Sequence, residues 1–113
     1  MRLRRPQEFQ QVWNGGRSWA HPLFILRAAP HPGMPLRIGI TASRKVGNAV
    51  ARNRARRLLR EAARHLYPAL IQGWDVVLIA RSPLLRAKMP EVLTALEQRF
   101  RSAGLWAAEI EAS

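Results

Sequence analysis

The stretch TASRKVGNAVARNRARRLLREAARH, from Thr41 to His65, contains eight basic residues and a single acid, Glu61. From Asn48 onward it has the spacing of an amphipathic helix, in which residues of one kind recur every three or four positions. One stripe of this helix is apolar and comprises Ala51, Ala55, Leu58, Leu59, Ala62 and Leu66. The opposite face comprises Asn53, Arg56, Arg57, Arg60 and Arg64, with Arg52 and Arg54 at its edges. We therefore expect a helix that packs one face on a core and exposes a row of arginines.

Basic residues also occupy the start of this helix, where folding alone favours acids. Arg44 and Lys45 precede Asn48, while Arg52 and Arg54 fall in the first turns. Unpaired N–H groups give a helix N-terminus a partial positive charge, and like charges one turn apart repel. Helix N-termini and arginine forks both suit phosphate. A run of charge is usually only a solvated face, but the scarcity of Asp and Glu here favours a nucleic-acid-binding surface.

The composition of the whole chain supports a polyanionic partner. The 113 residues carry a formal net charge of +12. Residues 66–113 contain five basic and five acidic residues, so the entire excess lies in residues 1–65. RNA, DNA and an anionic membrane are the candidate partners.

Several classes of protein are excluded or disfavoured by the same sequence. There is no cysteine, which excludes disulfides and thiolate metal sites. No apolar run reaches the length of a membrane span, and residues 1–20 lack the apolar core of a signal peptide. We expect a cytoplasmic protein with one domain over residues 1–113, including a basic arm at 1–5 and a C-terminal tail at 105–113.

The remaining segments predict an alternation of helices and strands. The expected elements are a helix from Pro6 to the Gly15-Gly16 stop, strands at 23–29, 36–41 and 74–81, and a helix from Pro90 to about 103. We allow for a further short strand around Trp19 and Ala20. The strands at 23–29 and 36–41 are expected to pair as a hairpin. Gly39 in mid-strand indicates a bulge or a close backbone approach.

The basic helix resembles a known signature, that of the bacterial ribonuclease P protein subunit. The similarity runs through Ser43-Arg44-Lys45-Val46-Gly47-Asn48-Ala49-Val50, Arg52-Asn53-Arg54 and Arg57-Leu58-Leu59-Arg60-Glu61. The flanking segments fit as well, so the resemblance covers nearly the whole chain. It implies an α/β two-layer sandwich like domain 2 of ribosomal protein S5, in the order α-β-β(-β)-α-β-α. It also implies a left-handed crossover through the central helix, although the general rule favours the right hand.

The resemblance further implies a noncatalytic subunit of an RNA-based endonuclease. The catalytic RNA partner would remove the 5′ leader of precursor tRNA by hydrolysis with bound Mg²⁺. The protein would bind that RNA through Arg44, Lys45, Asn48, Arg52, Asn53, Arg54, Arg56, Arg57, Arg60 and Arg64. Arginines make bidentate phosphate contacts, and Asn53 offers a donor and an acceptor to a base edge or 2′-hydroxyl.

A second set of residues is implied for the single-stranded leader. Phe9, Val12 and Trp13 share one face of the first helix; we expect Val12 to pack on the sheet. The family's positions that match Phe9 and Trp13 line a leader-binding cleft, where aromatic rings can stack on bases. Arg27 stands where family members often carry another aromatic, so a cation–π or phosphate contact would replace stacking. Trp106 matches a C-terminal aromatic near that cleft more loosely, and ordinary packing is an equal alternative.

The sequence offers little support for catalysis or metal binding by the protein itself. Its seven carboxylates are scattered over separate elements, and Asp75 is expected to pair with an arginine. The three histidines have no ligand or relay spacing, and His31 is expected to be exposed in a Pro-rich turn.

Three other functions compete with the ribonuclease P hypothesis. A generic binder of structured RNA, of the ribosomal type, explains the charge equally well, and only the specific motif argues against it. A DNA-binding helix-turn-helix needs a short helix before Asn48, where the sequence predicts a strand. An amphipathic membrane helix would carry larger apolar side chains than the Ala and Leu found here.

Overall fold

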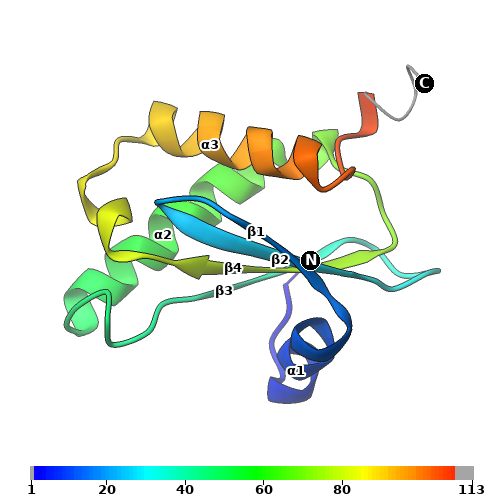
Figure 1. The fold of residues 1–113 in the computed structure, drawn as a ribbon, viewed down its shortest axis with the longest axis horizontal. Helices are drawn as coiled ribbons and strands as arrows, with labels where there is room; N and C mark the ends of the chain where they lie inside the picture. Colours follow the sequence, from blue (N-terminus) through cyan, green and yellow to red (C-terminus); the bar gives the residue numbers. More distant parts are fainter. Residues whose placement is uncertain (1, 109–113) are drawn as a thin grey trace.

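A four-stranded sheet forms the centre of the molecule, in the strand order β1-β2-β4-β3. In the computed structural model, which describes residues 2–108, α2 and α3 cover one face of this sheet and α1 lies against the other (Figure 1). The helices are α1 (Pro6–Gly15), α2 (Ala49–Leu66) and α3 (Met89–Ser102), and the strands are β1 (Arg17–Ala20), β2 (Phe24–Pro30), β3 (Arg37–Thr41) and β4 (Trp74–Ala80). The predicted α/β fold and its order of elements are confirmed.

The predicted hairpin between the second and third strands is wrong, because β4 lies between them. β2 pairs with β4 in antiparallel fashion, from Phe24 opposite Ala80 to Pro30 opposite Trp74, and β3 pairs with β4 in parallel. β4 is the most apolar strand, and the central position buries both of its faces: Val76 and Leu78 are fully buried on one face and Val77 is buried on the other. β2 instead forms its hairpin with β1, which confirms the short strand expected around Trp19 and Ala20.

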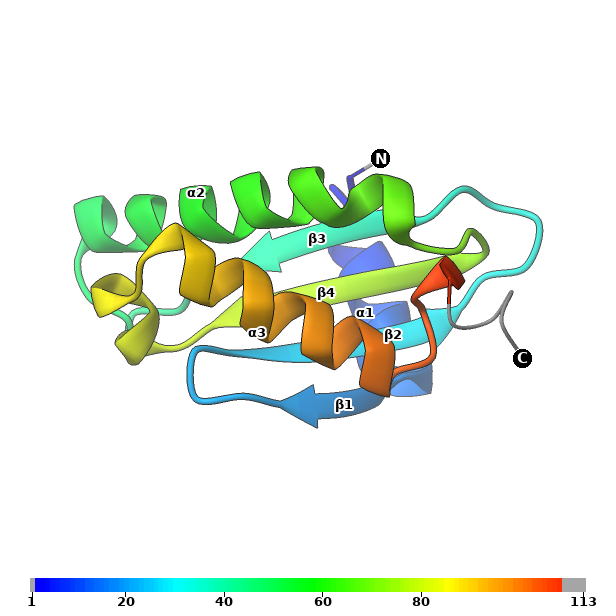
Figure 2. The same ribbon diagram turned by 90° about the horizontal axis from the view of Figure 1, so that it is seen from above.

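The connection from β3 through α2 to β4 is a left-handed crossover (Figure 2). The helix begins where the sequence predicts: the Asn48 side chain accepts a hydrogen bond from the Ala51 N–H at 2.9 Å. It ends at Leu66, and Pro68 follows within a short 3-10 turn (Tyr67–Ala69). The crossover places α2 along the β3 side of the sheet, while α3 lies closer to β1 and β2 (Figure 2).

Two apolar clusters hold these layers together. The larger lies between the sheet and the two long helices, and Phe24, Leu59 and Phe100 are fully buried in it. The smaller lies under α1 and comprises Leu3, Val12, Ala29 and Val77. Burial of Val12 confirms its expected packing on the sheet.

Both ends of the described chain are attached to the fold. In the basic arm, Arg2 forms a parallel bridge with Ile38, and the Leu3 N–H donates to the Ile38 carbonyl at 3.3 Å. At the other end, Leu105 is fully buried and Trp106 is paired with Leu70 through an isolated bridge. The first two residues of the expected tail therefore belong to the core; its residues 109–113 lie outside the described part of the chain.

A buried ion pair ties α1 to the sheet on the side away from α2. Asp75, 3% exposed, accepts hydrogen bonds from Arg37 at 2.9 and 2.7 Å, and Arg37 also contacts the carboxylate of Glu8 in α1. The expected arginine partner of Asp75 is thus Arg37. His31 is only partly exposed, because its Nδ1 lies 2.9 Å from Asp75 Oδ2.

The carboxylates of this network favour the ionised state. Burial alone would raise the pKa of Asp75, but the hydrogen bonds from Arg37 and His31 and the charge of Arg37 lower it below its ordinary value. The backbone N–H groups of Arg5 and Arg4 lower the pKa of Glu8, with a smaller contribution from Arg37. Since both values are lowered, this stabilisation is complete above the unfolded-state pKa of about 4 and is lost as the pH falls through the folded values.

Replacing Asp75 with Asn should therefore destabilise the protein strongly at neutral pH. The change leaves Arg37 buried with only the part-exposed Glu8, and breaking such a pair costs about 3 kcal/mol. Glu97→Gln is the matched control, because its pair with Arg101 is half-exposed and contributes at most about 0.5 kcal/mol. Urea unfolding at pH 7 and pH 3 measures the free energy of unfolding of both variants and of the parent. The difference between Asp75→Asn and the parent should shrink at the lower pH; an unchanged difference would contradict the linkage.

Candidate RNA interface

The exposed face of α2 is formed by a row of cationic and amide side chains. The exposed members are Asn53, Arg54, Arg57, Arg60 and Arg64. Arg52 and Arg56 are half-buried instead. The predicted places of Arg54 and Arg56 are therefore exchanged: Arg54 lies in the exposed row and Arg56 lies at its margin. Arg56 also donates to the side-chain oxygen of the exposed Asn53, so the amide N–H₂ of Asn53 is the group that can donate to another acceptor. We call the five exposed side chains the α2 row.

The arginines of the α2 row have no carboxylate partner in the described structure. Ion pairs among residues 2–108 join Arg37, His31 and Arg101 to Glu8, Asp75 and Glu97, and none involves α2. Glu61 is exposed on the same helix without entering an ion pair. The positive charge of the row is thus available to an external anion.

The loop before α2 extends this basic surface. Arg44 and Lys45 are exposed, and Lys45 is positioned through its carbonyl, which accepts a hydrogen bond from Ser82 Oγ at 3.0 Å. Asn48 caps the helix, so its side-chain oxygen is already used. The sequence analysis missed two further exposed cations after Ser82: Arg86 ends the neighbouring 3-10 turn (Ser82–Arg86), and Lys88 directly precedes α3. The signal for them was the lack of any acid between Asp75 and Glu91.

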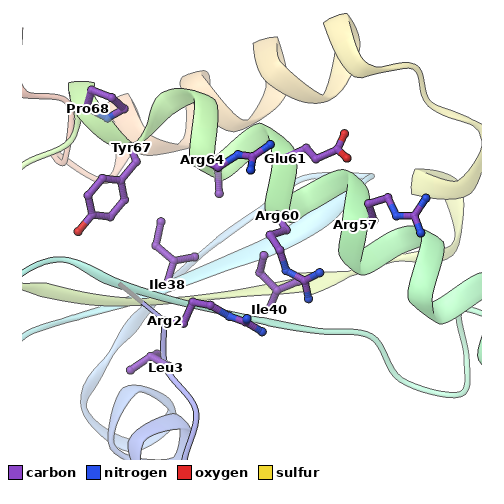
Figure 3. A pocket seen from close by; sticks show the side chains of 11 residues that line it. Arg2, Leu3, Ile38, Ile40, Arg57, Arg60, Glu61, Arg64, Tyr67 and Pro68 are labelled. Carbon is purple, nitrogen blue, oxygen red and sulfur yellow. The ribbon is translucent and has the colours of Figure 1, made fainter.

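A groove lies between α2 and the outer edge of β3, beside the α2 row (Figure 3). Its volume is about 570 Å³, and it is lined by Arg2, Leu3, Ile38, Ile40, Arg57, Arg60, Glu61, Ala63, Arg64, Tyr67 and Pro68. The sequence predicted exposed arginines on α2 but not that Arg2 lies near them, because this proximity depends on the arm lying along β3. We call this feature the β3 groove.

Three of the four residues predicted to contact the leader come together on the opposite face of the sheet. Arg27 lies in β2 and places its guanidinium 5.1 Å from the centre of the Trp13 ring. It also donates to the carbonyls of Val12 and Trp13 and, at 2.7 Å, to Ser18, so it fixes the end of α1. The Trp13 side chain stays 55% exposed.

Phe9 has a more structural position than Trp13. It is half-buried against the small cluster under α1, and its ring lies over Gly39: a Cβ at Gly39 would be 2.6 Å from the ring. This confirms the close backbone approach expected at Gly39. Beyond Phe9, Ile25 and Ile79 form a half-buried cross-strand pair on the same sheet face as Arg27. We call the surface formed by Trp13, Arg27, Ile25 and Ile79 the α1 face.

Trp106 is not part of the α1 face. It is 9% exposed in the cluster between the sheet and the long helices, with the Arg101 guanidinium 4.6 Å from its ring centre. The alternative of ordinary packing therefore describes Trp106, and the sheet separates it from Phe9 and Trp13.

Three structural observations bear on the competing functions. Residues 2–108 contain no group of three or more His, Asp or Glu side chains placed to hold a metal ion. None of the helices in that range has the length and apolarity that crossing a bilayer requires. The segment directly before α2 is β3 and a turn, so the short preceding helix of a helix-turn-helix is missing there.

Comparison with known proteins identifies the family. The model of the family described as Ribonuclease P matches residues 1–104. The ribonuclease P protein component of Roseiflexus sp. (strain RS-1) is 42% identical over 105 residues, which span 92% of this chain and 86% of the relative. That of Symbiobacterium thermophilum is 43% identical over 92% of this chain and 91% of the relative.

Solved structures of the same family superpose closely. The Staphylococcus aureus RNase P protein has a TM-score of 0.82 at 27% identity, covering 93% of this chain and 96% of the other. The Thermotoga maritima RNase P protein has a TM-score of 0.77 at 28% identity, covering 87% and 93%. The class defined by this fold and basic helix is that of RNA-associated proteins in tRNA processing. Within that class, the chain belongs to the bacterial ribonuclease P protein family, and its role is that of a subunit of this endoribonuclease.

Gly39→Ala should displace α1 and destabilise the fold. The new methyl group would meet the Phe9 ring at 2.6 Å and the Leu3 Cβ at 2.9 Å, and such overpacking costs about 1–3 kcal/mol. Gly15→Ala is the control, because it meets nothing within 4 Å and lies in the last turn of α1. Its stability should be unchanged or raised by up to about 1 kcal/mol. Thermal unfolding of the two variants would refute the role of Gly39 if their midpoints were equal.

Proposed function

We propose that this chain binds the catalytic RNA of ribonuclease P through the α2 row and holds the 5′ leader of precursor tRNA on its α1 face. The RNA would carry out the Mg²⁺-dependent hydrolysis that releases the leader, in the bacterial cytoplasm. The observation that carries this proposal is that the arginines of the α2 row are exposed and form no ion pair within residues 2–108.

Electrostatics explains why such a row suits a folded RNA. Each guanidinium that neutralises a phosphate releases a condensed counterion, which makes binding strong at low salt and weak at high salt. The α2 row is part of a rigid helix anchored by Ala55, Leu59 and Ala62, all fully buried. A rigid row of forks matches a fixed arrangement of phosphates, so recognition should depend on RNA shape more than on sequence.

The α1 face suits a single strand for a different reason. Trp13 is mostly exposed and backed by the Arg27 guanidinium, so its free surface can stack on a base without reading its identity. The Ile25–Ile79 pair continues the apolar surface across the sheet. This surface lies on the other side of the sheet from α2, so the two RNA ligands would not compete for the same side chains (Figure 1).

The described carboxylates are poorly placed for hydrolysis by the protein. Asp75 and Glu8 are both engaged by Arg37, and Glu97 is engaged by Arg101. Glu61 and Glu91 are exposed on different helices. This distribution supports a noncatalytic protein whose RNA partner supplies the metal-dependent step.

Cleavage of a precursor tRNA by the reconstituted ribonucleoprotein tests the proposal. The chain should raise cleavage by the cognate ribonuclease P RNA at low Mg²⁺ and should show no cleavage alone. RNA binding without any gain in cleavage would favour the generic structured-RNA binder. Preference for duplex DNA over the RNA would favour the DNA-binding alternative, and cleavage by the protein alone would overturn the assignment of chemistry to the RNA.

Arg54→Gln should weaken assembly with the catalytic RNA. Loss of one phosphate contact should lower the log–log salt slope by about 0.9 and the affinity about fivefold to tenfold. Arg17→Gln removes the same charge from the exposed edge strand β1, at the opposite edge of the sheet from β3. Filter binding at several salt concentrations measures the affinity and the salt slope of both variants. Equal loss in the two variants would mean that net charge, and not the α2 row, sets the affinity.

Trp13→Ala should weaken the contact with the leader while assembly stays intact. A lost stacking contact is worth about 1–3 kcal/mol, and truncation of this exposed ring leaves the core nearly unchanged. The measurement is the KM of the holoenzyme for precursor tRNA with a long leader and with a leader of one nucleotide. The variant should raise KM only for the long leader. A rise of the same size for both substrates would place Trp13 outside the leader contact.

A further inference from the structure

The β3 groove combines two kinds of surface that a simple phosphate contact does not need together. Its floor is apolar and is formed by Leu3 on the arm and by Ile38 and Ile40 on the edge strand. Leu3 and Ile38 are buried, so the accessible apolar surface comes mainly from the half-buried Ile40. Its rim is basic, with Arg2 on the arm and Arg57 and Arg60 on α2. In Figure 3 the guanidiniums of Arg2 and Arg60 approach the space in front of Ile40 from opposite sides.

The groove is held open by interactions that do not involve its free surface. The bridge between Arg2 and Ile38 fixes the arm along β3, which places the Arg2 side chain at the rim. Tyr67 closes one end, and its hydroxyl donates to the Leu36 carbonyl at 2.6 Å. Glu61 is the single acid in the lining, and Figure 3 shows its carboxylate pointing away from Ile40.

Paired RNA would not use this floor. In a duplex the base faces are stacked inside, so phosphates, sugars and polar base edges would reach a protein groove, and the half-buried Ile40 would remain partly against water. An unpaired base has an apolar face that gains from being covered, and its own phosphate requires a cation nearby. The volume of about 570 Å³ falls within the range of sites for small organic ligands.

We propose that the β3 groove binds one unpaired nucleotide of the RNA partner. The base lies on Ile38 and Ile40, and the phosphate lies between Arg2 and Arg60. This inference rests on the proposed RNA-binding function and adds to it a site for a bulged or looped-out nucleotide. The α2 row then reads the shape of paired RNA, and the groove beside it requires an unpaired base at a fixed distance.

Methyl NMR of the free protein tests the groove with small probes. Adenosine 5′-monophosphate should shift the Ile38 and Ile40 methyl resonances through its ring current, with weak affinity in the range of about 1 mM. Ribose 5-phosphate has the same phosphate without a base and should leave those methyl groups unshifted. Equal shifts by the two probes would mean that only the phosphate binds. Shifts confined to Ile25 and Ile79, or none up to about 10 mM, would also overturn the proposal.

Matched variants separate the groove from general electrostatics. Arg2→Gln should weaken adenosine monophosphate binding about threefold or more. Arg4→Gln removes the same charge two positions away, outside the groove lining, and should have a smaller effect. Equal weakening by both would exclude a specific role for Arg2.

The floor is tested by Ile40→Thr, which keeps a β-branched side chain in the strand and makes the surface polar. This variant should bind adenosine monophosphate about threefold more weakly, and its binding of ribose 5-phosphate should be unchanged. Ile71→Thr, at another half-buried isoleucine outside the groove, is the control for lost stability. If Ile40→Thr fails to fold, the Arg2 and Arg4 pair still decides the question, because neither side chain is in the core.

The result of the nucleotide-binding experiments is independent of the result of the cleavage assay. Nucleotide binding in the groove without stimulation of the ribonuclease P RNA would retain the site and reject the proposed function. Stimulation without nucleotide binding would retain the function and reject the site.

Discussion

The separation of α2 into a packed face and a charged face is the constraint on which the rest of the structure depends. An isolated helix with this many arginines near its start opposes its own dipole and repels itself. Its stability must therefore come from tertiary packing. Ala55, Leu59 and Ala62 are fully buried, and full burial of a leucine contributes about 2 kcal/mol. Small alanines let the helix approach the sheet closely, so the long arginine side chains extend away from the core on the other side.

The second constraint is that not every positive charge can serve the RNA. Arg37 is almost fully buried with Asp75, and Arg27 holds the carbonyls at the end of α1. These two cations position α1, and α1 in turn presents Trp13. Arg27 and Arg37 thus act on the architecture, whereas the arginines of the α2 row form no ion pair within residues 2–108. The distribution of acids explains the difference, because Asp75 and Glu8 pair with Arg37, whereas no acid among residues 2–108 forms an ion pair with the α2 row.

Local patterns in the sequence predicted local structure well. The cap at Asn48, the helix bounds near Pro6 and Pro90, the buried strand at 74–80 and the close approach at Gly39 all follow from nearest neighbours and periodicity. The pairing of strands did not follow, because β4 enters between β2 and β3 from more than 30 residues away along the chain. The left-handed crossover was available only through the family resemblance, since the general rule gives the opposite hand. Trp106 illustrates the same limit: a lone aromatic near the end of a chain has no periodicity to say which side of the sheet it packs on.

The β3 groove shows how a nonlocal contact can change what a basic helix recognises. A row of arginines on an isolated helix would bind any suitably spaced phosphates, and its selectivity would be low. The docked arm adds Arg2 from a distant part of the sequence, and the edge of β3 adds an apolar floor that phosphates cannot use. Water against the exposed part of Ile40 is unfavourable until a base covers it, whereas the arginines are well hydrated in any case. Discrimination between RNAs should therefore come less from the charges, which supply most of the affinity, than from the small apolar surface that lies between them.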